Sequence, residues 1–209
     1  MVQDHKGDAR DQMTFDWDEH AGGWDENPDV RTYADHAFTV LTKGIEIDGA
    51  RVLDFGCGTG LLTEKVAREA SEVVALDSAS KMLDVLARKG LENVTPVAGA
   101  LTPGLIAREP AFETKFDLIV ASSVLAFVPD YSQTLRQLRG LLRPGGKLIQ
   151  WDWLATPDSP DFGFTEPDIR DAMIAAGFDD PAITRPFEIS RGDDGPMPVL
   201  MAVASASGP

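Results

Sequence analysis

A nine-residue run, VLDFGCGTG (Val52–Gly60), constrains the fold of this chain more than any other feature. It begins inside an apolar segment, Ala50–Phe55, which is typical of a buried strand. Its three glycines permit backbone angles that other residues avoid, and they leave no side chains to block a ligand. After it, Leu62, Val66 and Ala70 recur every four residues, as on one apolar face of a helix. A strand that turns through glycines into a helix predicts a ligand-binding loop in an α/β protein.

Strand-like and helix-like patterns alternate along the rest of the chain. Thr165-x-x-Asp168 has the form of a capping box that begins a helix, and Arg143–Gly146 is expected to end another. The expected strands are Ala50–Phe55, Glu72–Asp77, Val94–Ala98, Phe116–Ala121, Lys147–Trp153, about 182–187 and about 198–204. This alternation predicts parallel pairing and right-handed crossovers. We therefore expect a doubly wound α/β fold with a mostly parallel, seven-stranded Rossmann-like sheet and helices on both faces.

The length of 209 residues fits one α/β domain. We expect residues 1–14 and 205–209 to be flexible tails and residues 50–204 to form the ligand-binding domain. Residues 15–49 are expected to form a helical or lid segment. Five aromatic residues precede the sheet, namely Phe15, Trp17, Trp24, Tyr33 and Phe38. Two interpretations stay open for them: a face that packs on the domain, or a flap over a ligand.

Composition argues against several classes of partner. The formal net charge is −15, from 34 acidic and 19 basic residues, which disfavours binding to nucleic acid or to an anionic membrane. The longest uncharged apolar run, Leu118–Val128, is too short to span a bilayer. Met1–Gln12 lacks the apolar core of a signal peptide, so we expect a cytoplasmic protein. A single cysteine, Cys57, excludes an intrachain disulfide. The oligomeric state stays open.

The spacing of the glycines separates this loop from two better-known nucleotide loops. A dinucleotide fingerprint would require glycine at position 61, which is Leu61, and no Gly-Lys-Ser/Thr follows as in a P-loop. Asp77 ends the second expected strand, about 20 residues after the first glycine, where a carboxylate can accept hydrogen bonds from a ribose diol. The pattern predicts a nucleoside ligand that is not a nicotinamide dinucleotide.

From about residue 15 to about residue 204 the chain resembles the class I S-adenosylmethionine-dependent methyltransferases. The resemblance rests on five motifs in order: VLDFGCGTG (Val52–Gly60), VALDSASKML (Val74–Leu83), FDLIVASSVLAFVPD (Phe116–Asp130), LRPGGKLI (Leu142–Ile149) and FTEPDIRDAMIAAGF (Phe164–Phe178). It implies S-adenosyl-L-methionine as cofactor and S-adenosyl-L-homocysteine as product.

The resemblance also implies a set of cofactor contacts. Asp54 would hold the ammonium group, Asp77 the ribose hydroxyls, and Met82 would pack on the adenine, although Met at such a position is as often plain core. The expected cofactor-binding residues are Asp54, Gly56, Cys57, Gly58, Gly60, Asp77, Ser78, Met82, Gly99, Ala100, Leu101 and Ser122. Two departures stand out: Ala100 replaces a common adenine-binding acid, and Ala126-Phe127 replaces a common histidine.

Methyl transfer needs positioning more than elaborate acid–base groups, because the cofactor is already activated. The candidates for a general base are Asp152, flanked by two tryptophans, and His20 and His36 in the N-terminal segment. A turn-capping role for Asp152 and surface roles for both histidines stay open. Cys57 is expected to pack rather than react, and no metal-binding spacing is present.

The sequence therefore predicts a methyltransferase that acts on a small-molecule acceptor, of apolar or aromatic character. The run Ala121-Ser122-Ser123-Val124 lacks the Asn/Asp-Pro-Pro-aromatic motif of nucleic-acid- or glutamine-directed relatives. The alternatives are a protein that binds S-adenosylmethionine without methyl transfer, and another reaction on the same fold. A nicotinamide oxidoreductase is disfavoured by Leu61.

Overall fold

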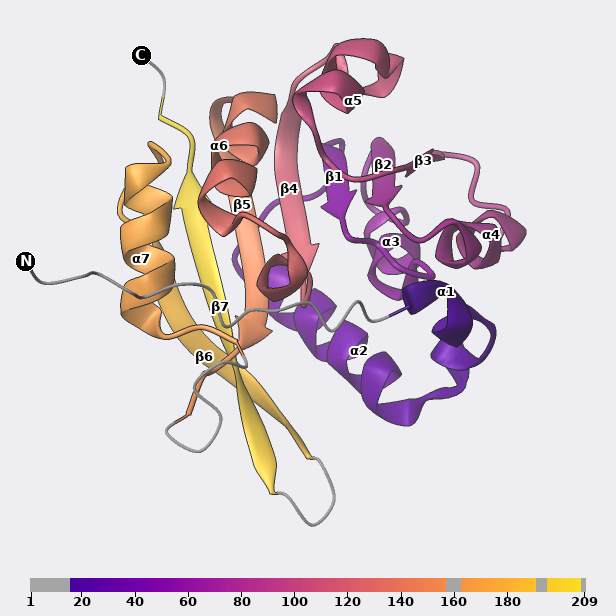
Figure 1. Ribbon diagram of the computed structural model, residues 1–209, viewed down its shortest axis with the longest axis horizontal. Helices are drawn as coiled ribbons and strands as arrows, with labels where there is room; N and C mark the ends of the chain where they lie inside the picture. The colour runs from indigo at the N-terminus through magenta and orange to yellow at the C-terminus, as the bar shows by residue number, and fades with distance from the viewer. Residues whose placement is uncertain (1–15, 157–162, 191–194, 208–209) are drawn as a thin grey trace, which may run out of the picture.

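A computed structural model describes residues 16–156, 163–190 and 195–207 of the chain. Seven strands form one sheet in the order β3-β2-β1-β4-β5-β7-β6 (Figure 1). Their bounds are β1 Arg51–Phe55, β2 Glu72–Asp77, β3 Val94–Ala98, β4 Phe116–Ser122, β5 Leu142–Trp153, β6 Ala182–Ser190 and β7 Pro196–Ser205. The expected doubly wound, mostly parallel sheet is confirmed. The expected tail over residues 1–14, and Phe15, lie outside the described residues.

The winding of the sheet reverses beside β1. β1 pairs in parallel with β2 on one side and with β4 on the other. The chain therefore runs outward through β1, β2 and β3, and returns to the centre as β4. Helices that follow strands on opposite sides of such a point diverge, and they leave a crevice at the carboxyl ends of the strands. The glycine loop after β1 and Ser122 at the end of β4 both face this crevice.

Only β7 runs against its neighbours. It pairs antiparallel with β5 over Lys147–Trp153 and antiparallel with β6, which forms the edge of the sheet. The ends of β6 and β7 project beyond the layered body of the protein (Figure 1). Because β6 and β7 are antiparallel, the chain passes from one to the other without a crossover helix.

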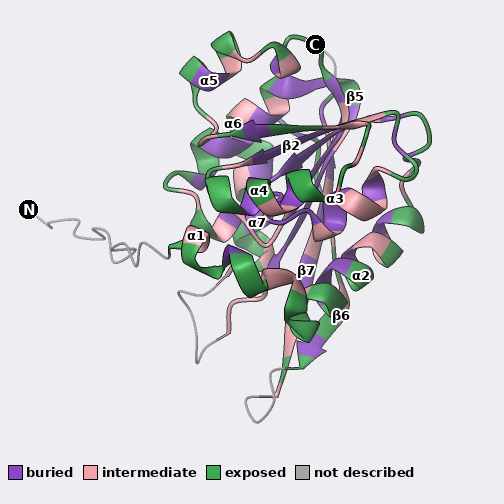
Figure 2. Ribbon diagram, turned by 90° about the vertical axis from the view of Figure 1, so that its right-hand side faces the viewer, coloured by how far each residue is buried: buried purple, intermediate pink, exposed green. Residues whose placement is uncertain are grey.

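Helices cover both faces of the sheet, and apolar side chains fill the space between the layers. On one face lie α2 (Pro28–Thr42), α3 (Leu61–Val66) and α4 (Ser80–Arg88), which pack against residues such as Val52 and Val120. On the other lie α5 (Pro103–Arg108), α6 (Tyr131–Leu141) and α7 (Glu166–Ala175), around Leu53 and Ile119. Figure 2 shows buried residues along the strands and exposed residues on the outer sides of the helices.

Several details differ from expectation at the ends of elements. The capping box is confirmed, because Thr165 and Asp168 exchange hydrogen bonds at the start of α7. The helix expected to end at Arg143–Gly146 ends slightly earlier, at Leu141, and β5 starts at Leu142 instead of Lys147, with an irregular register against β4. The prediction of a flexible tail over residues 205–209 was wrong for its first two residues. Ser205 ends β7, and Ala206 is buried and donates to the carbonyl of Gly146. Helix α5 was not expected.

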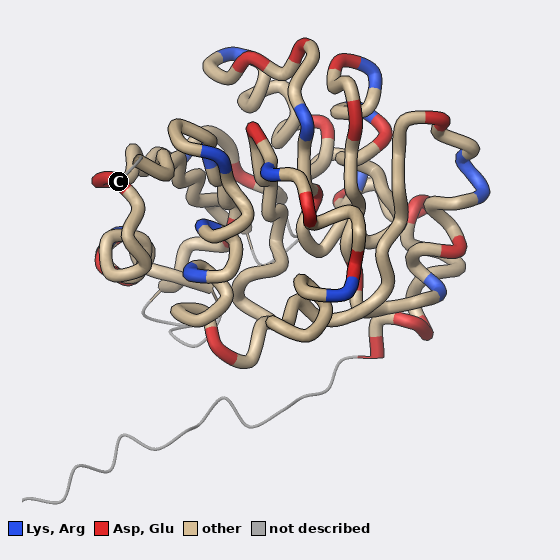
Figure 3. The backbone as a smooth tube through the Cα atoms, turned by 90° about the horizontal axis from the view of Figure 1, so that it is seen from above, with Lys and Arg blue, Asp and Glu red and all other residues tan. Residues whose placement is uncertain are grey.

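Most charged residues lie on the outside of the fold, and Asp54 and Asp152 are the buried exceptions in the described ranges. Figure 3 shows acidic and basic residues interspersed over many elements, with the acidic ones more numerous. None of the helices in the described ranges combines the length and the apolar composition that a bilayer crossing requires.

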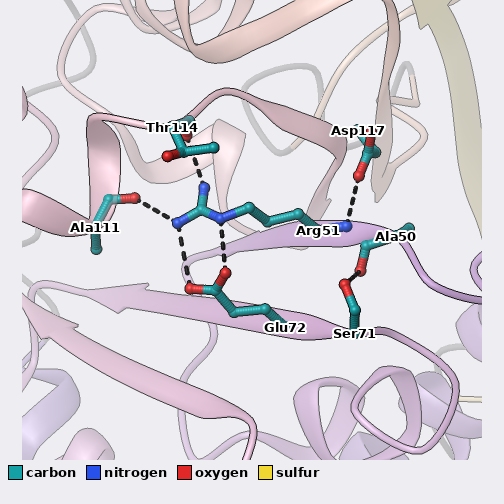
Figure 4. A network of polar contacts seen from close by, with 7 residues as sticks. All are labelled: Ala50, Arg51, Ser71, Glu72, Ala111, Thr114 and Asp117. Atoms are coloured by element: carbon teal, nitrogen blue, oxygen red, sulfur yellow. Dashed lines mark hydrogen bonds and ion pairs between the residues drawn. The ribbon is translucent and has the colours of Figure 1, made fainter.

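Arg51 is the first residue of β1, at the end of the strand away from the glycine loop, and it joins several segments there (Figure 4). Its Nε donates to Glu72 Oε2 at 2.8 Å, and two further nitrogens donate to the carbonyls of Thr114 (2.7 Å) and Ala111 (2.9 Å). Its guanidinium also lies over the ring of Phe116, 4.4 Å from the ring centroid. One side chain therefore fixes β1 to β2 and to the loop that leads into β4.

We predict that Arg51→Ala lowers the free energy of unfolding by about 1–2 kcal/mol, because the carbonyls of Thr114 and Ala111 and the ring of Phe116 lose the guanidinium that contacts them. The ion pair with the half-exposed Glu72 contributes the smaller share. Urea denaturation measures the effect. The matched control is Arg68→Ala, which removes an exposed pair with Glu64 and should cost less than about 0.5 kcal/mol. Equal losses in the two variants would contradict the assignment.

Candidate cofactor and acceptor site

A cavity of about 560 Å³ lies at the crevice predicted by the winding of the sheet. Its walls come from the glycine loop, the ends of β2 and β4, the loop after β3 and the N-terminal helices. This volume is within the usual range of small-molecule sites, about 300–1,000 Å³. The cavity is therefore large enough for a nucleoside cofactor and part of a second molecule.

The glycine loop presents bare main chain to this cavity at Gly58. Gly58 has φ +55°, and a Cβ placed on it would meet no atom within 4 Å. In contrast, a Cβ on Gly56 would lie 2.2 Å from a methyl group of Val124, and one on Gly60 would lie 2.3 Å from a methyl of Leu86. Gly56 and Gly60 are thus required by packing, whereas Gly58 leaves open space in which a ligand can lie against the backbone.

Asp77 connects the end of β2 to the glycine loop. Its Oδ2 accepts a hydrogen bond from the N–H of Gly58, and its Oδ1 accepts from the N–H of Ala79, each at 2.8 Å. Burial raises the pKa of this carboxyl, while the backbone donors oppose the rise. Each oxygen keeps a further acceptor site, which suits the two hydroxyls of a ribose.

Asp54 is fully buried below the loop. The hydroxyl of Thr63 donates to its Oδ2 at 2.6 Å. Burial raises the pKa of Asp54 to about 7; the charge of Asp77 also raises it, and the Thr63 hydrogen bond opposes the rise. A cation close to Asp54 would stabilise its ionised form.

The charges of the cavity fit a cationic cofactor. Asp29, Asp54 and Asp77 line it, and no lysine, arginine or histidine does so among residues 16–156, 163–190 and 195–207. S-adenosylmethionine carries an ammonium and a sulfonium group, so the donor set and the bare Gly58 are complementary to it. The residues present fit this cofactor.

The structure brings the predicted cofactor residues together. All of them except Gly60 line the cavity, including Met82 at one end and Ser122 at the end of β4. Gly99, Ala100 and Leu101 contribute the loop after β3, and Ser78 follows Asp77. Burial raises the pKa of the Cys57 thiol well above its usual range, so the thiol stays protonated and packs. The contact of each of these residues with the cofactor stays a prediction.

The N-terminal helices form the opposite wall. α1 (Trp17–His20) and the 3-10 helix η1 (Ala21–Glu26) lie next to α4 (Figure 1). Asp18 accepts from the N–H of Lys81 at 2.8 Å, and so caps α4 at a terminus that lacks a side-chain cap of its own. Asp25 accepts from the hydroxyl of Thr59 at 2.5 Å and pairs with Lys89 at 3.0 Å. Packing and cavity lining, posed as alternatives from the sequence, both apply to this segment.

The three candidate bases do not line the cavity. Asp152 is fully buried, and its Oδ2 accepts from Gln150, which in turn accepts from the hydroxyl of Tyr131 on α6. Burial raises the pKa of Asp152 to about 8, against the hydrogen bond from Gln150. His20 and His36 are exposed: His20 contacts the carbonyl of Asp16, and His36 packs edge-on against Phe187. A role for any of them in proton transfer stays a prediction.

Other lining residues were not among the site residues predicted from the sequence, although Tyr33 was one of the five aromatic residues considered as a packing face or a flap. Tyr33, on α2, lines the cavity with its hydroxyl buried, and Ser123 lines it in a left-handed conformation with φ 54°. Phe127 and Trp153 add apolar surface. A non-glycine residue with positive φ cannot be recognised from residue type alone, and Tyr33 has the spacing of an ordinary helix-face residue.

A doubly wound sheet with a glycine loop at the winding reversal and a carboxylate at the end of β2 defines a Rossmann-like nucleoside-binding protein. Residues 53–148 match the family model described as methyltransferase domain. Over these residues, just under half of its length, the chain is similar to methyltransferase domains.

Sequence relatives agree with this assignment over part of their length. The chain is 38% identical over 111 residues to a ubiquinone biosynthesis O-methyltransferase of Xylella fastidiosa (strain 9a5c), a match that covers 52% of this chain and 44% of the relative. It is 39% identical over 111 residues to the protein of the same name from Xanthomonas euvesicatoria pv. vesicatoria (strain 85-10), covering 52% and 45%. The matches thus span less than half the length of these curated relatives.

Solved structures share the fold. The DhpI–SAH complex superposes with a TM-score of 0.69 at 21% identity, covering 92% of this chain and 94% of that one. A SAM dependent methyltransferase from Aquifex aeolicus superposes with a TM-score of 0.68 at 18% identity, covering 90% and 98%.

We predict that Gly58→Ala lowers the affinity for S-adenosylhomocysteine about tenfold or more, since its methyl group enters space that only a ligand would fill. The control is Gly49→Ala, which has a similar φ of +68° and open surroundings but does not line the cavity. Both substitutions should cost about 1 kcal/mol of folding stability through backbone strain. Titration calorimetry and thermal unfolding separate the two effects. Unchanged affinity in Gly58→Ala would contradict the placement of the ligand.

We also predict that S-adenosylhomocysteine binds more weakly in acid. Asp54 has a pKa of about 7 in the free protein, so it is largely protonated at pH 6 and must lose a proton before it pairs with an ammonium group. Affinity should therefore rise by up to about tenfold from pH 6 to pH 8. Calorimetry across this range measures the slope, and Asp54→Asn should flatten it. An equal slope in that variant would assign the titration to another group.

Proposed function

We propose that this protein transfers a methyl group from S-adenosylmethionine to a small-molecule acceptor. The observation that carries the proposal is a single cavity lined both by acidic residues with bare backbone and by aromatic side chains. The names of the sequence relatives, which are O-methyltransferases, support an oxygen acceptor.

S-adenosylmethionine supplies an electrophilic methyl group on a positively charged sulfur when it is bound. Asp77 would hold the ribose, Asp54 would face the ammonium group, and the backbone at Gly58 would lie against the amino-acid part. Trp17, Trp24 and the other aromatic lining residues would orient the acceptor and exclude water. Correct orientation of the reactants can lower the barrier by at most about 7–11 kcal/mol.

The proposal assigns no dedicated base at the acceptor wall. The ionisable groups that line the cavity, within the described part of the chain, are three aspartates, one buried tyrosine and Cys57. Two of those aspartates are engaged on the cofactor side. We infer that positioning contributes most of the rate enhancement and that the acceptor loses its proton to solvent or to Asp29, the third lining aspartate.

The proposed setting is the cytoplasm, with no nucleic acid or membrane as partner. The acidic net charge supports this, because phosphate-rich surfaces would be repelled. Residues 15–49 would act as the lid segment of a domain formed by residues 50–204.

Asp77→Asn tests the proposal. We expect calorimetry to detect binding of S-adenosylmethionine and S-adenosylhomocysteine to the unchanged protein, and a loss of about tenfold or more in this variant, since a neutral amide cannot accept both ribose hydrogen bonds and both backbone bonds. Formation of S-adenosylhomocysteine with a panel of hydroxylated aromatic acceptors then measures turnover.

Two outcomes would change the proposal. Absence of binding to either compound would overturn it entirely. Binding without turnover across the acceptor panel would favour the alternative of a cofactor-binding protein that does not transfer methyl groups.

A further inference from the structure

The hydroxyl of Tyr33 is the most unusual polar group of the cavity. Tyr33 is 7% exposed and lines the cavity, yet its hydroxyl has no hydrogen-bond partner among the described residues. Burial raises its pKa well above the usual range, so it stays protonated. A buried hydroxyl without a partner costs about 1–3 kcal/mol, which makes this position costly unless a ligand satisfies it.

Two serines at the end of β4 lie beside this hydroxyl. Ser122 and Ser123 are near enough to lower the pKa of Tyr33, but neither forms a hydrogen bond of acceptable geometry with it. Ser123 is held by its N–H, which donates to the carbonyl of Trp151 at 2.7 Å, and its φ is 54°. Such strained conformations cluster at functional sites, where they aim a side chain. The result is a cluster of three hydroxyls on the cavity wall.

Aromatic neighbours fix the orientation of Tyr33. Its ring packs against Trp153, with centroids 5.3 Å apart, and edge-on against Phe187 at 5.4 Å. A ring held on two sides cannot easily turn its hydroxyl away from the cavity. The two rings therefore restrict the positions that the hydroxyl can take at this wall of the cavity.

The remaining surface of the cavity limits the charge and shape of that occupant. Trp17, Trp24, Phe127 and Trp153 offer flat apolar surface. The charged side chains that line the cavity, in the described ranges, are all aspartates. An anionic acceptor would lose hydration there without meeting a cationic side chain, which is unfavourable.

We propose that Tyr33 is the positioning residue for the acceptor, and that it binds the oxygen of an uncharged aromatic hydroxyl compound beside Ser122 and Ser123. The inference rests on the proposed function, because it requires the cofactor to occupy the acidic side of the cavity. It adds a charge class for the acceptor and a residue that selects it.

Calorimetry on the full chain saturated with S-adenosylhomocysteine tests this proposal with two matched probes. The first, 2-naphthol, is neutral at pH 7.5, and the second, 6-hydroxy-2-naphthoate, has the same rings and hydroxyl with an added carboxylate. We expect 2-naphthol to bind and the carboxylate to bind at least about tenfold more weakly. Tyr33→Phe should reduce the affinity for 2-naphthol about five- to tenfold and leave the affinity for S-adenosylhomocysteine unchanged.

Tyr131→Phe is the matched control. It also removes a buried tyrosine hydroxyl, but that hydroxyl donates to Gln150 at 2.7 Å and does not line the cavity. We expect Tyr131→Phe to lower the melting temperature and keep the 2-naphthol affinity, whereas Tyr33→Phe should keep or raise the melting temperature and lose affinity. A merely structural role for Tyr33 would not produce this opposite pattern.

The outcomes separate the two proposals. If S-adenosylhomocysteine binds but 2-naphthol does not, or both probes bind equally, or Tyr33→Phe keeps full affinity for 2-naphthol, the acceptor proposal is overturned while the methyltransferase proposal stands. Absence of S-adenosylhomocysteine binding overturns both.

Discussion

The hydrogen bond from the N–H of Gly58 to the carboxylate of Asp77 organises the site on which the rest depends. Gly58 follows β1 and Asp77 ends β2, so this bond fixes the distance between two loops that a parallel ladder alone would leave free. The second oxygen of Asp77 receives the N–H of Ala79, just before α4 begins. One side chain therefore sets the shape of the glycine loop, the start of a helix and the position of its own acceptor sites. This explains why an acid is needed at the end of β2 even before any ligand arrives.

The proposed function assigns the cavity a cofactor side, at Asp54 and Asp77, and an aromatic acceptor side. The charge of Asp77 contributes to the raised pKa of Asp54, which is fully buried, whereas Asp77 is partly buried. Such an arrangement is unfavourable in an empty protein and becomes favourable when a cation enters, so part of the folding stability is exchanged for affinity. The aromatic half carries the opposite preference. It offers hydroxyls and flat apolar surface, and it excludes anions through the same aspartates that attract the cofactor.

Much of the fold could be predicted from the sequence because its signals are local. The apolar run at Ala50–Phe55, the glycine spacing and the capping box at Thr165 each specify a conformation within a few residues. The cofactor-binding residues could be predicted for the same reason, since Gly58 follows β1 and Asp77 ends β2, the next strand along the chain. The acceptor side depends on contacts between distant segments. Tyr33 lines the cavity together with Ser122 and Ser123, which follow about 90 residues later in the chain, so no local pattern could pair them. Asp152 is bonded to Gln150 and does not line the cavity, which depends on how the layers pack on β5.

The N-terminal segment links the two halves mechanically. Asp18 caps α4, whose Met82 lines the cofactor side, and Asp25 is held by Thr59 of the glycine loop and by Lys89 at the end of α4. Each of these partly exposed contacts is worth only about 1 kcal/mol or less, so no single one fixes the segment. Trp17 adds edge contacts to Trp24 and Phe127, and the latter belongs to the turn after β4. The aromatic wall is consequently anchored to the very loops that hold the cofactor. A shift of the glycine loop would move the acceptor wall with it, and this couples the position of the acceptor to correct seating of the cofactor.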